Sequence, residues 1–218
     1  MLAYLLGEAS PTLLRNTVAI AVAGLVGTLI SSVAVAYAFA RFPLPGKNLM
    51  LIILIGTIIL PSQARLMPRY AFFNTIGWTG TWLPLIVSHV FANAYNVFLL
   101  RQYFMTLPRD VDEAAMIDGA NPLQIFVRVV LPVAGPALAA AAIICFAFAW
   151  NEYLFASIIA PNKAKPYTFL VASTSTVRGI HFGFVATRLL IAIALPVILS
   201  LFVQRYIVRG LTLGAVKG

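Results

Sequence analysis

The sequence predicts an all-α, polytopic membrane protein, that is, a bundle of helices that cross a lipid bilayer. Hydrophobic residues make up 61% of its 218 residues, and charged residues only 10%. Because soluble domains carry about 25% charged residues, a soluble fold of this length would leave much of its surface apolar. Uncharged runs of about 20 residues, the length that crosses the hydrocarbon core, recur along the chain. The short alternating strands of a membrane β-barrel are absent.

The net charge of +9 favours lipid contacts over nucleic-acid binding. Lys and Arg gather at the ends of the apolar runs, where they orient spanning helices and bind phospholipid headgroups. We therefore expect membrane lipids as partners and no nucleic acid. The single cysteine, Cys145, lies inside an apolar run, which predicts a small packing residue and leaves no partner for an intrachain disulfide.

Five membrane spans are expected, between an N-terminal extramembrane segment (1–15) and a C-terminal tail (209–218). The spans belong to a membrane domain, 16–208, and run over about 16–40, 48–64, 79–100, 131–161 and 182–204. An odd number of spans places the long loop 102–130 and the tail on one side of the membrane. Arg41 and Lys47 mark the first turn of that side as cytoplasmic, although basic residues are nearly balanced between the two sides.

The first two spans have clear ends. The first is rich in Ala, Gly and Ser, which lets helices approach closely, and the prolines at 43 and 45 end it. Pro61 breaks the second span. The following segment, 70–78, is aromatic and is expected to lie along the outer membrane interface, where Tyr and Trp are enriched.

Five polar residues in the later spans are candidates for a substrate path. His89, Asn93 and Asn96 are spaced to share one face of the third helix. They would line a water-filled path or form hydrogen bonds between helices. The fourth span is expected to start with Pro132 at its first helical position. Asn151 and Glu152 would then lie about 30 Å away, near the outer boundary, lining the path or simply facing water.

The loop 102–130 is the most polar part of the chain and contains four of its six acidic residues, Asp110, Asp112, Glu113 and Asp118. Acidic residues stabilise the first turn of a helix, Gly119 can end that helix in the left-handed conformation, and an Asn-Pro pair can start another. The sequence therefore predicts a helix–turn–helix whose second helix carries an apolar stripe, Leu123, Phe126, Val127 and Val130. The alternatives are a docking surface and a plain connector lying on the membrane.

This loop resembles the EAA loop of permease subunits of binding-protein-dependent ABC importers. The family pattern, EAA, three residues, Gly, about nine residues and I-x-L-P, matches at Glu113, Ala114, Ala115, Gly119 and Leu131-Pro132, with Val129 where Ile is usual. Segments 96–101, 150–152 and 209–218 are similar to the carbohydrate branch, more narrowly the maltose type. The family has six spans, and the first run here corresponds to the second of them, which implies a truncated start or a shorter variant.

The resemblance implies partners and site residues. The partners would be a second permease subunit, a cytoplasmic ATPase dimer and an extracytoplasmic solute-binding protein, which would dock near residues 162–182. The residues that couple to the ATPase would be Glu113, Ala114, Ala115, Asp118, Gly119, Ala120 and Pro122. The tail residues that reach toward the ATPase would be Arg209, Gly210, Leu211, Thr212, Gly214 and Lys217.

The chain is expected to be a transporter subunit and not an enzyme by itself. It has no phosphate-binding loop with the pattern GxxxxGK[ST], so ATP and Mg²⁺ would be bound by partner subunits, and we expect no cofactor or metal here. The leading hypothesis is a pore subunit that moves a sugar or polyol into a bacterial or archaeal cell across the plasma membrane. The alternatives are a proton-coupled transporter that uses His89, Glu152 and Arg188 as a relay, and a membrane scaffold.

Overall fold

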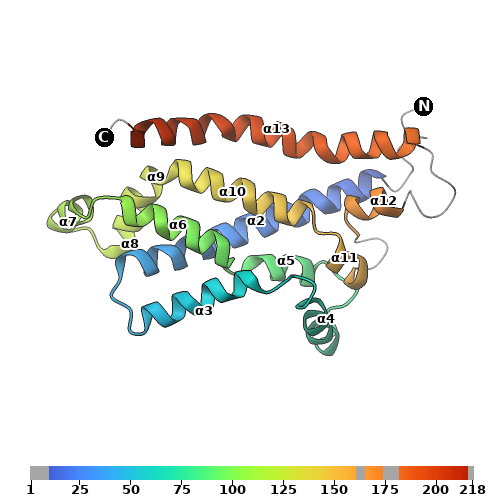
Figure 1. Cartoon of the computed structure of the whole chain (residues 1–218), viewed down its shortest axis with the longest axis horizontal. Helices are drawn as coiled ribbons and strands as arrows, with labels where there is room; N and C mark the ends of the chain where they lie inside the picture. Colours follow the sequence, from blue (N-terminus) through green and yellow to red (C-terminus); the bar gives the residue numbers. More distant parts are fainter. Residues whose placement is uncertain (1–9, 161–164, 174–181, 216–218) are drawn as a thin grey trace.

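The computed structural model describes residues 10–160, 165–173 and 182–215, and within these ranges every regular element is helical. Long helices run side by side along the molecule, with α13 on one edge and α3 on the other (Figure 1). The main ones are α2 (Ser10–Arg41), α6 (Ala94–Thr106), α10 (Gly135–Trp150) and α13 (Phe182–Ala215). The predicted all-α bundle is confirmed.

Four helical stretches are long and apolar enough to cross a membrane, namely Pro11–Arg41, Leu83–Thr106, Gly135–Ile159 and Val185–Gln204. The expected second span is shorter, because α3 (Lys47–Ile59) has 13 residues. At 1.5 Å per residue it is about 20 Å long, against about 30 Å of hydrocarbon. The predicted break is present, since Leu60 is extended before Pro61, and α4 (Leu66–Thr75) follows.

The third span is not one continuous helix. It consists of α5 (Leu83–Val90) and α6, separated by an extended Phe91 and by Asn93, which caps α6. The prediction that His89, Asn93 and Asn96 share one helix face is therefore wrong. A spacing of three or four residues places side chains on one face only where the helix is unbroken.

The fourth span begins later than predicted. A helical run extends from Pro122 through α8 (Pro122–Ile125), a π-helical segment (Phe126–Val130) and α9 (Leu131–Val133). The chain bends at Ala134, and α10 starts at Gly135 with Pro136 in its first turn. Pro132 therefore lies within this helical run and not at the first position of the fourth span. The span ends, as expected, close to Pro161, with α11 (Leu154–Ile159).

Helix α2 is the central packing element. It contacts α5, α6, α10 and α12 (Tyr167–Ser173). A Cβ added at Gly24 would lie 3.0 Å from the Cβ of His89, and a Cβ added at Gly27 would lie 2.9 Å from the Cα of Val90. The predicted close approach of small residues is present, and it sets the position of α5 against α2.

The two ends of the bundle differ. At one end lie the turn after α2, the short helices α7 (Asp110–Ile117) and α8, and the C-terminal end of α13 (Figure 1). At the other end lie α4, α11 and α12. We call the first the loop end and the second the far end. The loop 102–130 and the end of α13 therefore lie together, as the two spans between them, Gly135–Ile159 and Val185–Gln204, require.

Candidate coupling site

Helix α7 has the start and the end that its sequence predicts. Asp110, Asp112 and Glu113 occupy its first turn, where carboxylates complement the positive end of the helix dipole. Its end is a Schellman motif: the N–H of Gly119 donates to the Met116 carbonyl at 3.0 Å, and that of Ala120 to the Ala115 carbonyl at 3.0 Å. Gly119 has φ +82°, a left-handed conformation that favours glycine.

The second helix of the loop starts with a capping box. The Asn121 side chain accepts from the backbone N–H of Gln124 at 2.9 Å, and the Gln124 side chain accepts from the backbone N–H of Asn121 at 2.9 Å. Pro122 occupies the first turn, as predicted. The helix–turn–helix is therefore confirmed, and it is fixed at both sides of Gly119 by local hydrogen bonds.

The predicted apolar stripe of the second helix is only half right. Val130 is buried and Phe126 packs against the core, but Leu123 is 69% exposed and Val127 is also exposed. Ile125 and Val129 contribute to the core in their place. The helix face that packs on the core is therefore turned away from Leu123 and Val127 and toward Ile125 and Val129.

The predicted coupling residues lie on and around one exposed surface. Ala115 and Ala120 are half-buried against the core. Ile117, at the tip of α7, is 88% exposed, and Met116 is exposed beside it. We define the coupling face as the exposed residues Glu113, Ala114, Met116, Ile117, Asp118, Gly119 and Pro122. A carboxylate flanked by exposed apolar side chains, at the end of the molecule, is typical of a protein interface.

Asp112 does not belong to this face. It is only 7% exposed and forms an ion pair with Arg41, the last residue of α2, with 2.9 Å between Arg41 Nε and Asp112 Oδ2. Arg41 Nη2 also donates to the Leu107 carbonyl at 3.1 Å. The sequence predicts a topology signal at Arg41 and an acidic residue of a first helical turn at Asp112, and it does not predict this pair. No local spacing connects two residues so far apart.

The substrate-path candidates His89, Asn93 and Asn96 lie at the break between α5 and α6. The Asn93 side chain accepts from the N–H groups of Tyr95 and Asn96. Asn96 is fully buried and its Nδ2 lies 3.1 Å from Cys145 Sγ. Three hydroxyls of α2 bind the backbone of the break. Thr28 donates to the His89 carbonyl and Ser31 to the Val90 carbonyl. Ser32 accepts from the N–H of Asn93. Asn93 and Asn96 thus stabilise the break and the α6–α10 contact.

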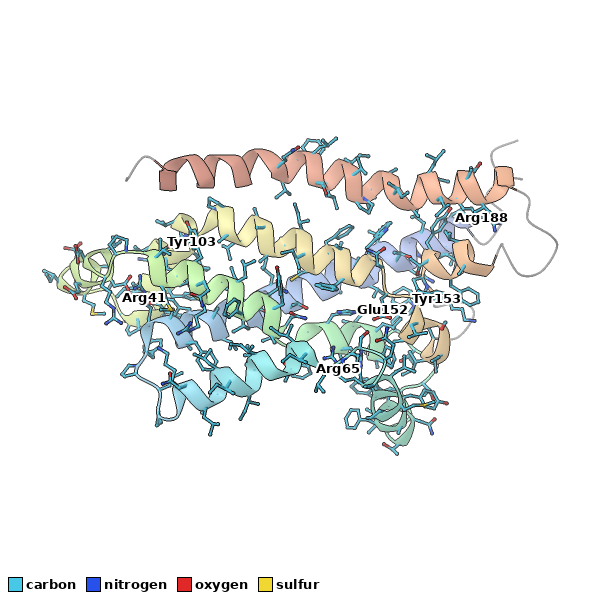
Figure 2. The ribbon with its side chains drawn as sticks, in the orientation of Figure 1. Arg41, Arg65, Tyr103, Glu152, Tyr153 and Arg188 are labelled. Carbon is cyan, nitrogen blue, oxygen red and sulfur yellow. The ribbon has the colours of Figure 1, made fainter. Side chains whose placement is uncertain are left out.

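Glu152 lies at the far end (Figure 2), directly after Asn151, the C-cap of α10. Glu152 is half-buried, and its Oε1 accepts from the N–H of Phe155 at 3.1 Å, which caps α11. The guanidinium of Arg69 stands 4.0 Å from the centre of the Phe155 ring. Burial lowers the pKa of Arg69, and the nearby Glu152 carboxylate partly opposes that shift. Asn151 is exposed, and its side chain donates to Ala147 at 2.8 Å.

The predicted C-terminal tail is helical in its described part. The backbone of residues 209–215, which includes Arg209, Gly210, Leu211, Thr212 and Gly214, continues α13. Lys217 lies outside the described residues, as does most of the expected docking segment 162–182. At the other terminus, residues 10–15 belong to α2. Among the described residues, no three His, Cys, Asp or Glu side chains gather closely enough to hold a metal ion.

Comparison with known protein families identifies the class of the chain. Residues 29–213 match the model of the family described as "Binding-protein-dependent transport system inner membrane component". The chain belongs to this family. It is therefore a multi-pass subunit of the inner membrane, and the resemblance carried by Glu113, Ala114, Ala115 and Gly119 is confirmed.

Two relatives within the family are named as permeases of sugar transport systems. The chain is 33% identical over 211 residues to the alpha-glucoside transport system permease protein AglG of Rhizobium meliloti, covering 93% of this chain but only 56% of the relative. It is 34% identical over 211 residues to the trehalose/maltose transport system permease protein MalG of Thermococcus litoralis, covering 95% of this chain and 76% of the relative. The chain thus spans about half to three quarters of the length of these two proteins.

The fold is that of a solved importer subunit. The structure of a bacterial ABC transporter involved in the import of the acidic polysaccharide alginate superposes with a TM-score of 0.81, at 24% identity, covering 94% of this chain and 78% of that chain. The chain therefore has the fold of an ABC importer permease.

Proposed function

We propose that this chain is one of two pore-forming permease subunits of an ATP-driven importer, and that it moves a sugar or sugar-like solute into the cell by alternating access. The observation that carries the proposal is the coupling face. A rigid, doubly capped helix–turn–helix projects at one end of a membrane bundle with Glu113 and an exposed apolar tip. Such a projection suits a cleft in a cytoplasmic partner, with a basic residue opposite Glu113.

The partners follow from the same surfaces. ATPase subunits would dock on the coupling face and on the end of α13, and would bind ATP and Mg²⁺, since this chain offers no phosphate-binding loop. A second permease subunit would cover part of the exposed apolar surface of the bundle, and lipid the rest. A solute-binding protein would deliver the solute at the far end. Closure and reopening of the ATPases would move the coupling face as a rigid body.

A carbohydrate is the favoured substrate class. The names of the relatives AglG and MalG refer to alpha-glucosides and to trehalose and maltose. Glucose-containing disaccharides are therefore the first solutes to test, with sn-glycerol 3-phosphate as the non-disaccharide comparison. The family match supports this ATP-driven class over the proton-coupled alternative, and the Glu152 carboxylate is engaged by the N–H of Phe155.

The decisive experiment is uptake by the assembled complex. The chain would be produced with its partner subunits, reconstituted in proteoliposomes, and supplied with the binding protein and labelled trehalose, maltose or sn-glycerol 3-phosphate. The proposal predicts accumulation that requires ATP on the ATPase side and survives a protonophore. Uptake that continues without ATP and stops with the protonophore would show that the chain is a secondary transporter instead.

A further inference from the structure

We propose that Arg41 and Asp112 form a positioning link through which movement of α7 reaches the spanning helices α2 and α6. The inference rests on the proposed function, since it assumes that an ATPase moves the coupling face. It concerns a pair of side chains that lies behind this face.

The first observation is how little of α7 is attached to the bundle. Of its eight residues, all of them described, Asp112 alone is buried. Ala115 is half-buried, and Glu113, Met116 and Ile117 face outward. A helix held by so few contacts transmits force only through those contacts.

The second observation is that one guanidinium joins three elements. Arg41 is the last residue of α2, Asp112 lies in α7, and the Leu107 carbonyl directly follows α6. Arg41 Nε and Asp112 Oδ2 are 2.9 Å apart, and Arg41 Nη2 donates to Leu107 at 3.1 Å. The two charged side chains are only 9% and 11% exposed. Figure 2 shows Arg41 at the loop end, beside α7 and α8.

Burial makes this ion pair costly to separate. Solvent replaces a surface ion pair easily, but two charges taken out of water are costly to separate, because each then lacks a partner. The Arg41 guanidinium also donates from Nη2 to the Leu107 carbonyl, so one side chain contacts both α7 and the residue that follows α6. Movement of α7 therefore pulls on the ends of α2 and α6 and does not simply break the pair.

The third observation is that the link adjoins the coupling face. The lining of a pocket of about 200 Å³ includes both Arg41 and Asp112 and the coupling-face residues Glu113 and Met116. A second contact runs in parallel, since the Tyr37 ring of α2 lies 4.7 Å from the Phe126 ring in the second loop helix. Tyr37 also contacts Phe104 of α6. The aromatic contact holds the second loop helix, and the ion pair holds α7.

The test measures sugar transported per ATP hydrolysed in the complete importer in proteoliposomes, with labelled maltose or trehalose, whichever the wild-type complex accumulates. The variants are Asp112→Asn, Arg41→Gln and the double variant, and the matched control is Asp110→Asn, an exposed carboxylate in the same turn. The ratio is expected to fall about tenfold in each single variant, within the usual range of coupling between sites. The double variant is expected to fall no further, and ATPase subunits should copurify as in the wild type.

The sugar-to-ATP ratio separates positioning from stability, because a merely structural defect lowers the yield of complex and not the ratio. If the single variants fail to assemble, the double variant, in which no charge is buried alone, gives the answer. A wild-type ratio in the double variant, or an equal loss in Asp110→Asn, would overturn the inference. A wild-type complex without ATP-dependent uptake would overturn the proposed function and the inference with it.

Discussion

Asp112 and Glu113 are adjacent acidic residues in the first turn of one helix, and they have opposite surroundings. Glu113 is exposed on the coupling face, whereas Asp112 is buried against Arg41. Successive residues of a helix point about 100° apart, so one turn can present a carboxylate to solvent and another to the bundle. Residue type alone therefore does not give the role of either group. Exposure suits Glu113 to the proposed docking role, and burial makes Asp112 a contact between α7 and α2.

Reversing the charge of Glu113 should disconnect the transporter from its ATPase. In Glu113→Lys, a basic residue of the ATPase would face another basic residue, and like charges at an interface cost several kcal/mol. We expect normal membrane insertion, loss of ATPase copurification and a fall in uptake of at least about tenfold. Lys47→Glu reverses a charge on the first residue of α3, outside the coupling face, and serves as the control. Normal uptake by Glu113→Lys would contradict the role of the coupling face.

The turn between the two loop helices requires a residue with a positive φ at position 119. Proline fixes φ near −65°, and Gly119 has φ +82°, so Gly119→Pro should destroy the turn and abolish uptake. Gly119→Ala should be milder, with a cost of about 1–2 kcal/mol for the left-handed conformation. Gly119→Asn should retain the most uptake of the three, because asparagine tolerates this conformation. Uptake assays and ATPase copurification would give the order, and equal activity of the proline and asparagine variants would refute this account.

At the scale of elements, the contact between α2 and the α5–α6 break is the main packing contact of the bundle. A broken helix exposes backbone groups that cannot bind water inside a bilayer. Here three hydroxyls of α2 bind them, and two glycines of α2 allow the close approach that those bonds need. The small residues of α2 and the broken third span thus require each other.

A larger side chain in the contact between α2 and α5 should destabilise the bundle. A Cβ at Gly27 would lie 2.9 Å from the Val90 backbone, so Gly27→Val forces the two helices apart and costs about 1–3 kcal/mol. We expect a lower unfolding temperature in detergent and less folded protein in the membrane. Gly56→Val is the matched control, because nothing lies within 4 Å of an added Cβ at Gly56 in α3. Equal stability of the two variants would argue against the contact.

At the scale of the whole molecule, large apolar surfaces are left uncovered by the chain itself. On α3, Ile52, Ile53 and Ile59 are exposed, and none of the described α13 residues in the span Val185–Gln204 is buried. For a soluble protein such patches would be a liability. In a membrane subunit they suit lipid, and the proposed second permease would cover part of them. The bundle thus has apolar sides and, at one end, a coupling face that contains the acidic residues Glu113 and Asp118.

A charge on the apolar side should therefore prevent membrane assembly. Lysine at the centre of the membrane costs about 2.5–3.5 kcal/mol on insertion scales, so Ile53→Lys, in the middle of the short apolar helix α3, should reduce the membrane-integrated protein several-fold. Ile53→Val keeps the side chain apolar and should not. Extraction of membranes with carbonate, followed by quantification of the retained protein, measures both. Full retention of Ile53→Lys would show that this position faces water.

The sequence by itself determined the class of the molecule and the local structure of its loop. Spanning helices follow from uncharged runs, because a bilayer offers no partner for unpaired backbone groups. The turn at Gly119, the capping box at Asn121 and the break before Pro61 follow from backbone chemistry within a few residues. Such features need no knowledge of the rest of the chain.

Only the tertiary structure decided which side chains meet across the bundle. The Arg41–Asp112 pair, the break at Phe91 and the burial of Asn96 depend on contacts between residues far apart in the sequence. Helical spacing predicted a shared face for His89, Asn93 and Asn96, but the hydroxyls of α2 stabilise the break that separates them. Local patterns give the elements and their ends, and the fit between elements decides which polar groups are buried, paired or left on the surface.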